Sequence, residues 1–521
     1  MAGDHPRAVA RSQARSGGGR LPHVLPYHPE HYRGTRAGQR RAGRGGGRCR
    51  LLPLGHRRPR GRAVEPAGRV GPVEADAARL HRQFWLPSLQ ARKAAPLIPL
   101  ATEPHEYPYA FHIALDGNGL NGLEGRAGVC VFHYDPATGR YAYKIDYYDG
   151  IAGGHAVSVS PDHAVGFLGN TGQHLLFYDT ATLDETARLS TLRIEPTDSS
   201  IKGTTHVTWL GDREFVGAIG EHLWRFDLDK LDAPERLGPH GLKLPHAMKT
   251  TASGRYLVYG GMDHPGRGEA REVGIFDLHT GTARHVGLPA TCWHVAAHPR
   301  EDRFYALSFR VLPQEGHDWH EWAMAYLKEY VFEIDAAHGQ VLRHWTAPRE
   351  TPAHINSDVC VSDRELIYCN GGSGTIVMID LDDFATHRII DERPGLPEQL
   401  LAGRQALHQV TDAFTRGSPT ASSRHFLAAL RVSRGTLLDS VYACQLSADQ
   451  TLLFTANRGL NTITIYDYPA NTVRQRVHMP ELRQYVDGLS WRHDPRLGFH
   501  HGTLISPRDR EFKTQAGDSP A

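Results

Sequence analysis

Apolar and polar residues alternate over short stretches throughout the second half of this chain, and turn residues separate these stretches. Alternation with a period of two is typical of β-strands that bury one face. The clearest example is ACQLSADQTLLFTANRGLNTITIYDYPANTVRQRV, which predicts four strands with turns at Ser447–Gln450, Asn457–Gly459 and Pro469–Asn471. The pattern therefore predicts an all-β protein made of short, locally connected strands.

The four-strand unit repeats from residue 155 onward with a period of about 40–50 residues, which is the length of one propeller blade. Six complete units are recognisable, because similar segments lead into their fourth strands. Besides the C-terminal unit, these segments are FYDTATLDETARL, RFDLDKLDAPERL, IFDLHTGTARHV, EIDAAHGQVLRHW and MIDLDDFATHRII. The repeat therefore predicts six blades in sequence order.

A seventh blade is expected to be split between the two ends of the repeat region. Residues 127–148 have the pattern of third and fourth strands, whereas residues 485–506 have the pattern of first and second strands. Joining the two parts closes the ring and leaves no exposed strand edge. We therefore expect an all-β, seven-bladed β-propeller closed by strands from both termini.

Three segments carry a resemblance to a known group of propellers. LLFTANRGLNTITIYD, SVSPD and LPHAM are similar to YVTN-type repeats of lactonase-like proteins and of amine-dehydrogenase and nitrite-reductase propeller chains. The resemblance covers about residues 127–506 and implies the propeller fold. It includes no cofactor motif of any one member, and a propeller fold hosts many functions, so it leaves the function open.

Charge separates the N-terminal part of the chain from the rest. Residues 1–95 hold 20 Lys and Arg against 5 Asp and Glu, which leaves 39 against 52 in residues 96–521. Residues 1–80 consist largely of Arg, Gly, Pro and Ala without apolar periodicity, which favours a disordered basic extension over a nucleic-acid-binding tail. We expect an extension at 1–95, the propeller at 96–510 and a disordered C-terminal tail at 511–521.

The cysteines and the hydrophobic segments give an expectation for the cellular compartment of the protein. The six cysteines form no CxxC pair, and most fall within apolar stretches, so we expect buried free thiols. No recognisable signal peptide and no apolar run of transmembrane length occurs in the sequence. The expectation is a cytoplasmic protein without a membrane partner.

Histidine recurs at the start of the innermost strand in five successive predicted blades. The residues are His155, His206, His246, His294 and His354. The first strand of a propeller blade lines the central channel, so these residues should ring one channel mouth. Only 33 of the 521 residues are histidine, so composition does not explain five such coincidences.

Two interpretations of this register remain open. Several neutral imidazoles in one pocket form a site for a transition metal such as copper, iron, manganese or zinc. Alternatively, each ring hydrogen-bonds to the backbone of the neighbouring blade and has a structural role. Histidine-lined propeller mouths that hold metal occur in carotenoid-cleavage oxygenases, nitrous-oxide reductase and some lyases, which this chain resembles in that arrangement alone.

The longest departures from the blade pattern are residues 261–271, 311–329 and 394–436, which should emerge on the same face as the histidines. Such insertions are typical of a lid over a pocket. The second insertion contains HDWHEW, from which His320 is a catalytic candidate. Asp487, in the predicted first strand of the split blade, is a candidate base or additional metal ligand, with salt-bridging or turn-capping as its structural alternative.

The sequence contains no GxSxG elbow, no P-loop and no nucleotide-binding GxGxxG motif in a strand-to-helix context. The leading hypothesis is a metal-dependent oxidoreductase that acts on a small-molecule substrate between the histidines and the lid. A metal-assisted lyase or lactone hydrolase is the nearest alternative. The third hypothesis is a binding or scaffold propeller with structural histidines and a protein partner on the decorated face.

Overall fold

The computed structural model describes residues 107–115, 126–151, 153–197, 202–262, 270–311, 330–347, 356–371, 374–392, 441–457, 462–479 and 498–507. Antiparallel strands account for most of these residues. Two short 3-10 turns also occur among them, η3 (Thr191–Arg193) and η4 (Leu228–Lys230). Within the described ranges, no helix has the length and apolar character needed to cross a membrane.

Six four-stranded blades follow one another along the chain, and in each blade the strands pair in sequence order. The first three are β4 (Gly154–Val159), β5 (Val165–Asn170), β6 (His174–Asp179) and β7 (Glu185–Ser190); β8 (Val207–Trp209), β9 (Glu214–Ile219), β10 (His222–Asp227) and β11 (Glu235–Pro239); and β12 (Pro245–Thr250), β13 (Tyr256–Gly261), β14 (Glu272–Asp277) and β15 (Thr282–Gly287).

The fourth, fifth and sixth blades complete this series. They are β16 (Ala290–Ala297), β17 (Arg303–Val311), β18 (Tyr330–Asp335) and β19 (Gln340–Thr346); β20 (Asn356–Val361), β21 (Glu365–Asn370), β22 (Thr375–Asp380) and β23 (His387–Asp391); and β24 (Val441–Leu446), β25 (Leu452–Asn457), β26 (Thr462–Asp467) and β27 (Thr472–His478). The predicted repeat of six successive blades is therefore confirmed.

The closing blade combines strands from both ends of the described chain. β28 (Phe499–Ile505) lies innermost, and β1 (Tyr109–Leu115), β2 (Arg126–Asp135) and β3 (Arg140–Asp149) follow outward. β28 pairs antiparallel with β1 and makes one parallel bridge, from His501 to Ala156, with the first blade. Closure by strands from both termini is thus confirmed.

The division of strands within the closing blade differs from the prediction. Residues 127–148 form its third and fourth strands as expected, but the described part of residues 485–506 supplies only the innermost strand. The second position belongs to β1, whose sequence YAFHIAL is buried at every residue. A nearly continuous apolar stretch suits a strand packed on both faces, and this signal in residues 109–115 was overlooked.

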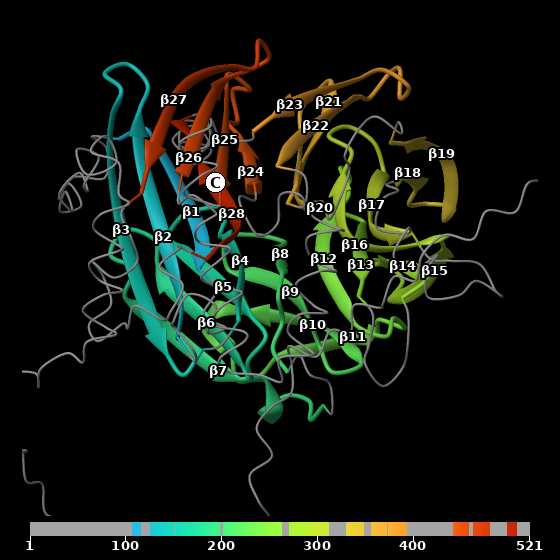
Figure 1. Cartoon of the computed structure of the whole chain (residues 1–521). Coiled ribbons are helices and arrows are strands. Elements are labelled where there is room, and N and C mark those ends of the chain that lie inside the picture. Colours follow the sequence, from blue (N-terminus) through green and yellow to red (C-terminus); the bar gives the residue numbers. More distant parts are fainter. Residues whose placement is uncertain are drawn as a thin grey trace, which may run out of the picture.

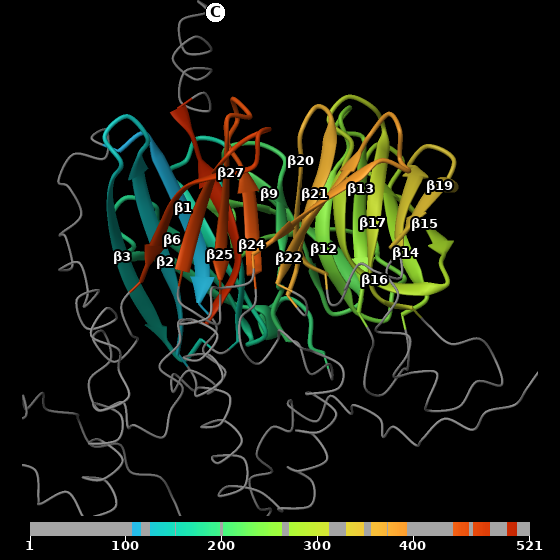
Figure 2. The same ribbon diagram turned by 45° about the horizontal axis from the view of Figure 1, so that its top comes forward.

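The blades surround a common centre, with β4, β8, β12, β16, β20, β24 and β28 innermost and strands such as β3, β7 and β19 at the periphery (Figure 1). The view in Figure 2 shows the same blades tilted by 45°. Apolar cores lie between successive blades. Phe111 of the closing blade packs with Phe454 of the sixth, and Val129 packs in a cluster with Leu168 of the first. The closing blade is therefore buried against both neighbours.

The turns before the fourth strands explain the repeated Asp seen in the sequence. Asp135, Asp277 and Asp335 each accept a hydrogen bond from the backbone N–H two residues later, at 2.8–2.9 Å. Each of these turns ends with a glycine at a φ of +68° to +69°, which residues with a Cβ rarely adopt. Local turn chemistry thus fixes where each fourth strand begins.

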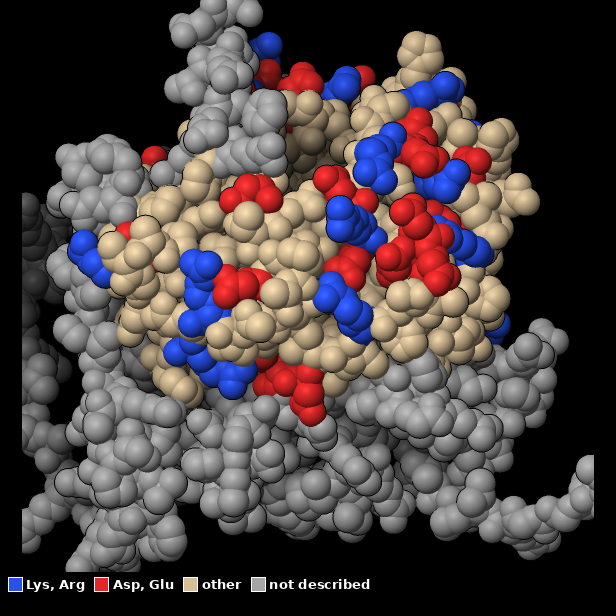
Figure 3. Space-filling view, turned by 90° about the horizontal axis from the view of Figure 1, so that it is seen from above, with Lys and Arg blue, Asp and Glu red and all other residues tan. Residues whose placement is uncertain are grey.

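Charges of both signs lie side by side on the face seen in Figure 3. Salt bridges within single blades include Arg343–Glu333, Arg388–Glu365 and Arg474–Asp467. On this face, the described residues show interleaved acidic and basic side chains rather than one extended basic area. Local ion pairing of this kind differs from the phosphate-binding surfaces of nucleic-acid-binding proteins.

Candidate metal centre

Four of the predicted histidines come together at the centre of the ring. His155 lies in β4, His246 in β12 and His294 in β16, whereas His206 immediately precedes β8. The ring centroids are 4.7 Å apart for His155 and His246, 4.5 Å for His206 and His246, and 5.0 Å for His246 and His294. The recurrent register in the sequence therefore corresponds to real proximity.

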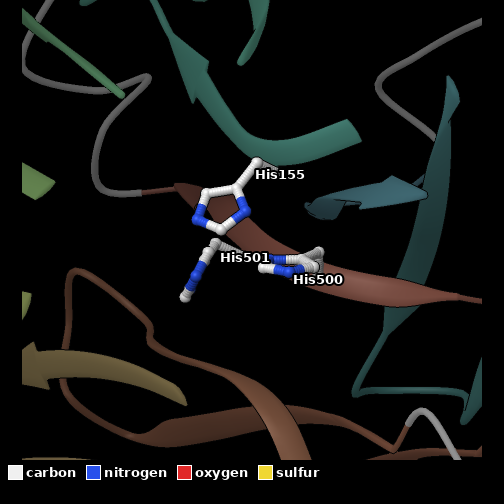
Figure 4. Close-up of side chains that lie close together, drawn as sticks. All are labelled: His155, His500 and His501. Atoms are coloured by element: carbon white, nitrogen blue, oxygen red, sulfur yellow. The ribbon is translucent and has the colours of Figure 1, made fainter. Parts of the chain in front are cut away.

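Two more imidazoles, from His500 and His501 in β28, join this group. The centroid of His155 lies 4.1 Å from that of His500 and 5.0 Å from that of His501, and the three rings converge in Figure 4. His501 also lies 4.9 Å from His294. We call His155, His206, His246, His294, His500 and His501 the histidine cluster.

Sequence reasoning missed His500 and His501 because it began the innermost strand of the split blade at Tyr485. The structure begins that strand at Phe499. The available signal was the pair of adjacent histidines in GFHHGTLI, directly at the start of an apolar stretch. This is the position that histidine occupies in the first four blades.

A local irregularity in strand pairing positions these side chains. The register of the innermost strand shifts between Gly154 and Ala156, between Pro245 and Met248, and between Cys292 and His294. In β28, two residues, His500 and His501, stand opposite one residue of β1. Such bulges bend a strand and change the direction of its side chains. The imidazoles therefore point toward the centre of the ring rather than toward a neighbouring blade.

The fifth and sixth blades place other side chains at the equivalent positions. Asn356 and Asp358 flank the register shift of β20, and Tyr442 lies at the shift of β24. The Tyr442 ring is 4.5 Å from that of His500. Asn356 lies near His294, although neither side chain makes a hydrogen bond of normal geometry within the described residues.

Burial keeps the imidazoles neutral. It holds the pKa values of His155, His206 and His294 well below their usual range, and the neighbouring histidines lower them further because imidazolium ions would repel one another. The same two causes lower the pKa of His246 to about 3. A neutral imidazole keeps one nitrogen lone pair free for a metal ion.

One hydrogen bond indicates the tautomer of His246. Its Nδ1 lies 3.1 Å from the Trp293 carbonyl oxygen, which only accepts hydrogen bonds, so Nδ1 carries the proton. The Nε2 lone pair then faces Nε2 of His155 at 2.6 Å. In the metal-free protein, a neutral His155 therefore donates the proton on its Nε2 to this lone pair, and a metal ion at these nitrogens would displace that proton.

Asp358 connects the histidine cluster to the surrounding strands. Its carboxylate accepts a hydrogen bond from the Cys444 backbone N–H at 3.0 Å and lies 3.4 Å from Nδ1 of His501. Metal-binding histidines commonly have a carboxylate at the second ring nitrogen, which orients the ring. Asp358 was not singled out in the sequence, because its role depends on three strands that only the fold brings together.

The donor set fits a transition metal. The ligand atoms of His155, His500 and His501 lie within 4.8 Å of one another, and so do those of His155, His206 and His246. Ligands at tetrahedral positions about 2.1 Å from a metal are about 3.4 Å apart, so modest side-chain adjustment brings either triad to a bound geometry. Nitrogen ligands of this type suit copper, zinc and iron.

Several predicted features lie outside the described residues. They are His354, His320 and Asp487, most of the insertion at 261–271, nearly all of 311–329 and all of 394–436. The strands that flank the first two insertions end beside the histidine cluster, because Gly261 pairs with Pro245 and Val311 with Ala290. The lid and the roles of the three residues stay predictions.

Trp293 adds an aromatic surface to the centre. Its ring stacks on Phe309 with centroids 3.6 Å apart and contacts His246 at 5.6 Å. Its position is compatible both with packing and with lining the site. An apolar wall beside convergent polar groups is a common feature of small-molecule sites.

No family model and no curated protein sequence matches this chain. Among solved structures, hydrazine synthase of Kuenenia stuttgartiensis aligns with a TM-score of 0.42 and 11% identity, covering 63% of this chain and 87% of that chain. The β-propeller domain of Cps50 (Swd1) from Myceliophteria thermophila gives 0.39 and 11%, with the same coverages.

A third solved structure, dihydro-heme d1 dehydrogenase NirN, aligns with a TM-score of 0.44 and 11% identity, covering 80% of this chain and 78% of that chain. The YVTN-type resemblance has no support from these comparisons and stays a prediction. The assignment of the fold rests on the strand order of the blades themselves.

Proposed function

We propose that this protein is a metal-dependent enzyme, an oxidoreductase that acts on a small organic molecule at the histidine cluster. The observation that supports the proposal is the convergence of six imidazoles from five blades on the ring centre. Four of them have pKa values lowered by burial, so they are neutral ligands at neutral pH.

The composition of the cluster favours copper or iron over manganese. Manganese prefers carboxylate and other oxygen ligands, whereas all six side chains here offer imidazole nitrogen. A bound copper or iron ion supplies electron transfer and Lewis acidity. The chain supplies the rest: Asp358 orients His501, the Trp293 carbonyl fixes the tautomer of His246, and the stacked Trp293 and Phe309 rings offer an apolar contact for an organic substrate.

The scaffold hypothesis requires that the rings bond to neighbouring backbones. Among the four predicted histidines, the described contacts include one such bond, from His246 to Trp293. His155 faces His246 instead, and both nitrogens of His294 are buried without a hydrogen-bond partner among the described residues. Buried polar atoms are nearly always satisfied in proteins, so the unsatisfied rings favour a missing cation over a purely structural role.

The proposal is tested by metal analysis of the full-length chain purified without a histidine tag. We expect at least about one copper or iron ion per chain in the wild type, a marked loss in His155→Ala, because His155 belongs to both triads, and no loss in His338→Ala. His338 is a matched control, because its side chain is 75% exposed in an outer turn and pairs with Asp335.

Stability provides a second readout of the same variants. Metal should raise the free energy of unfolding of the wild type by about 2.7 kcal/mol at a hundredfold excess over Kd, while the metal-free wild type and His155→Ala melt nearly alike. A wild type with far less than one ion per chain, unchanged by added copper, iron, manganese or zinc, would refute the metal site and favour the scaffold hypothesis.

Metal replacement separates oxidoreductase from lyase or lactone hydrolase. Zinc does not change its oxidation state, so a zinc-loaded protein should be inactive as an oxidoreductase but active in a hydrolytic or elimination reaction. Substrate-dependent reduction of the copper-loaded protein, followed optically, would support the proposed class. Turnover with zinc alone would support the alternative.

A further inference from the structure

The histidine cluster contains more ligands than one ion uses. A tetrahedral site takes four ligands, and a catalytic one leaves a position open for water or substrate. The histidine cluster offers six imidazoles, and the spacing between their ligand atoms is uneven. Their ligand atoms form two compact triads, His155 with His500 and His501, and His155 with His206 and His246.

The two triads come from different parts of the ring. His500 and His501 belong to the closing blade, whereas His206 and His246 belong to the second and third blades. His155 of the first blade belongs to both triads, with ring centroids 4.1 Å from that of His500 and 4.7 Å from that of His246. A neutral imidazole offers one lone pair, so His155 bridges two ions only after its N–H proton is released to solvent, when each ring nitrogen binds one ion.

We propose that the histidine cluster binds two transition-metal ions side by side, one held by His500 and His501, the other by His206 and His246, with His155 between them. This proposal rests on the proposed function, since it assigns two ions to the same metal centre. Because the two nitrogens of a bridging imidazole lie on different edges of the ring, the two ions would be farther apart than the about 3.5–4 Å that is common for paired metal ions in proteins.

The charge of the surrounding residues limits the charge of the metal ions that can occupy both positions. Neutral imidazoles bring no negative charge, and Asp358, near His501, is the carboxylate that contacts the cluster in the described part of the chain. A buried cluster with excess positive charge is costly. Monovalent copper carries half the charge of the divalent metals, so reduced copper is the form best suited to filling both triads.

The test adds Cu²⁺ together with ascorbate, which reduces it to Cu⁺, to the full-length, tag-free protein and counts copper per chain after desalting. Electron paramagnetic resonance after oxidation of the bound copper with ferricyanide is the second readout. We expect about two coppers per chain and a spectrum with magnetic coupling between close ions. His206→Ala and His500→Ala should each bind about one copper with an uncoupled spectrum. His338→Ala, the exposed control, should behave as the wild type.

Each outcome has a defined meaning. One uncoupled copper in the wild type overturns the two-ion proposal but leaves the proposed function standing. No bound copper overturns the two-ion proposal, and it overturns the proposed function as well if added iron, manganese and zinc are not bound either. Two uncoupled coppers place the second ion outside the cluster and also overturn it. Circular dichroism verifies folding, and His206→Gln and His500→Gln replace any alanine variant that fails to fold, because glutamine keeps side-chain volume without the imidazole nitrogen.

Discussion

The histidine cluster and the network around Glu392, between the fifth and sixth blades, are both buried polar groups, but they satisfy their atoms differently. The Glu392 carboxylate accepts hydrogen bonds from Asn457 at 2.9 Å and Thr464 at 2.6 Å, and pairs with Arg476 at 3.2 Å. In the histidine cluster, rings face other rings, and both nitrogens of His294 lack partners among the described residues.

This difference shows what each region is for. A complete network such as that of Glu392 contains its own counter-charge and joins strands of two blades, so it serves structure. The buried nitrogens of His294 have no hydrogen-bond partner among the described residues, which is unfavourable unless a ligand or cation binds at the cluster. The protein therefore can build satisfied buried networks, and the unsatisfied state of the histidine cluster points to a ligand.

Both buried regions depend on a closed ring of blades. Opening the ring should therefore have the largest effect on stability. A chain ending at residue 497 lacks β28, and with it His500, His501 and the innermost strand of the closing blade. We expect it to lose cooperative unfolding, because β1 would have an unpaired inner edge and the cores shared with the sixth and first blades would lose Phe499, Leu504 and Ile505. A chain starting at residue 96 should keep it. Equal melting of the two proteins would contradict the role of β28.

Glu392→Ala should lower the free energy of unfolding by about 3–5 kcal/mol. The substitution leaves the Arg476 guanidinium, one amide group and one hydroxyl group without the carboxylate that they contact. This loss of stability should be independent of bound metal. Urea unfolding with and without added copper measures it, and the same loss should appear in both conditions. A loss that appears only with copper would mean that the network belongs to the metal site.

The two regions should respond to pH with opposite signs. Burial lowers the pKa of His246 from 6.5 to about 3 and raises that of Glu392. Below pH 6.5 these histidines bind protons in the unfolded chain but stay neutral in the folded protein. The free energy of unfolding of the metal-free protein should therefore fall by about 1.4 kcal/mol per pH unit for each such histidine. Glu392 binds a proton more readily when folded, so its contribution improves as the pH falls.

Urea unfolding of the metal-free protein between pH 7 and pH 5 measures the sum of these effects. We expect net destabilisation toward pH 5, because several histidines oppose one glutamate. His246→Gln should reduce the slope, and Glu392→Gln should make the loss on acidification steeper near the upper titration range of the carboxyl group. A stability that does not change over this interval would contradict the neutral, buried state of the cluster.

A smaller effect should follow from crowding the strands behind the cluster. A Cβ on Gly260 would lie 2.2 Å from the Trp293 carbonyl oxygen, the group that bonds to His246. Gly260→Ala should therefore cost about 1–3 kcal/mol and weaken metal binding. Gly287→Ala is the control, since nothing lies within 4 Å of the added carbon. Equal thermal melting of both variants would show that this close approach is not required.

Much of the fold was predictable because its signals are local. Strand alternation and the Asp-to-Gly turns before the fourth strands lie within a few residues of each other, as in Asp277 to Gly281. The order of strands in the closing blade was predicted wrongly, because β1 and β28 are at opposite ends of the chain. Only packing decides which of two apolar strands lies second, and the fully buried β1 takes that position.

The sequence by itself determined the recurring blade and the shared position of His155, His206, His246 and His294, since both depend on a local period that the chain repeats. Tertiary structure decided the membership of the cluster. Bulges turned the rings inward, ring closure added His500 and His501, and the approach of three innermost strands placed Asp358 beside His501. These relations join residues hundreds of positions apart, and no spacing along the chain encodes them.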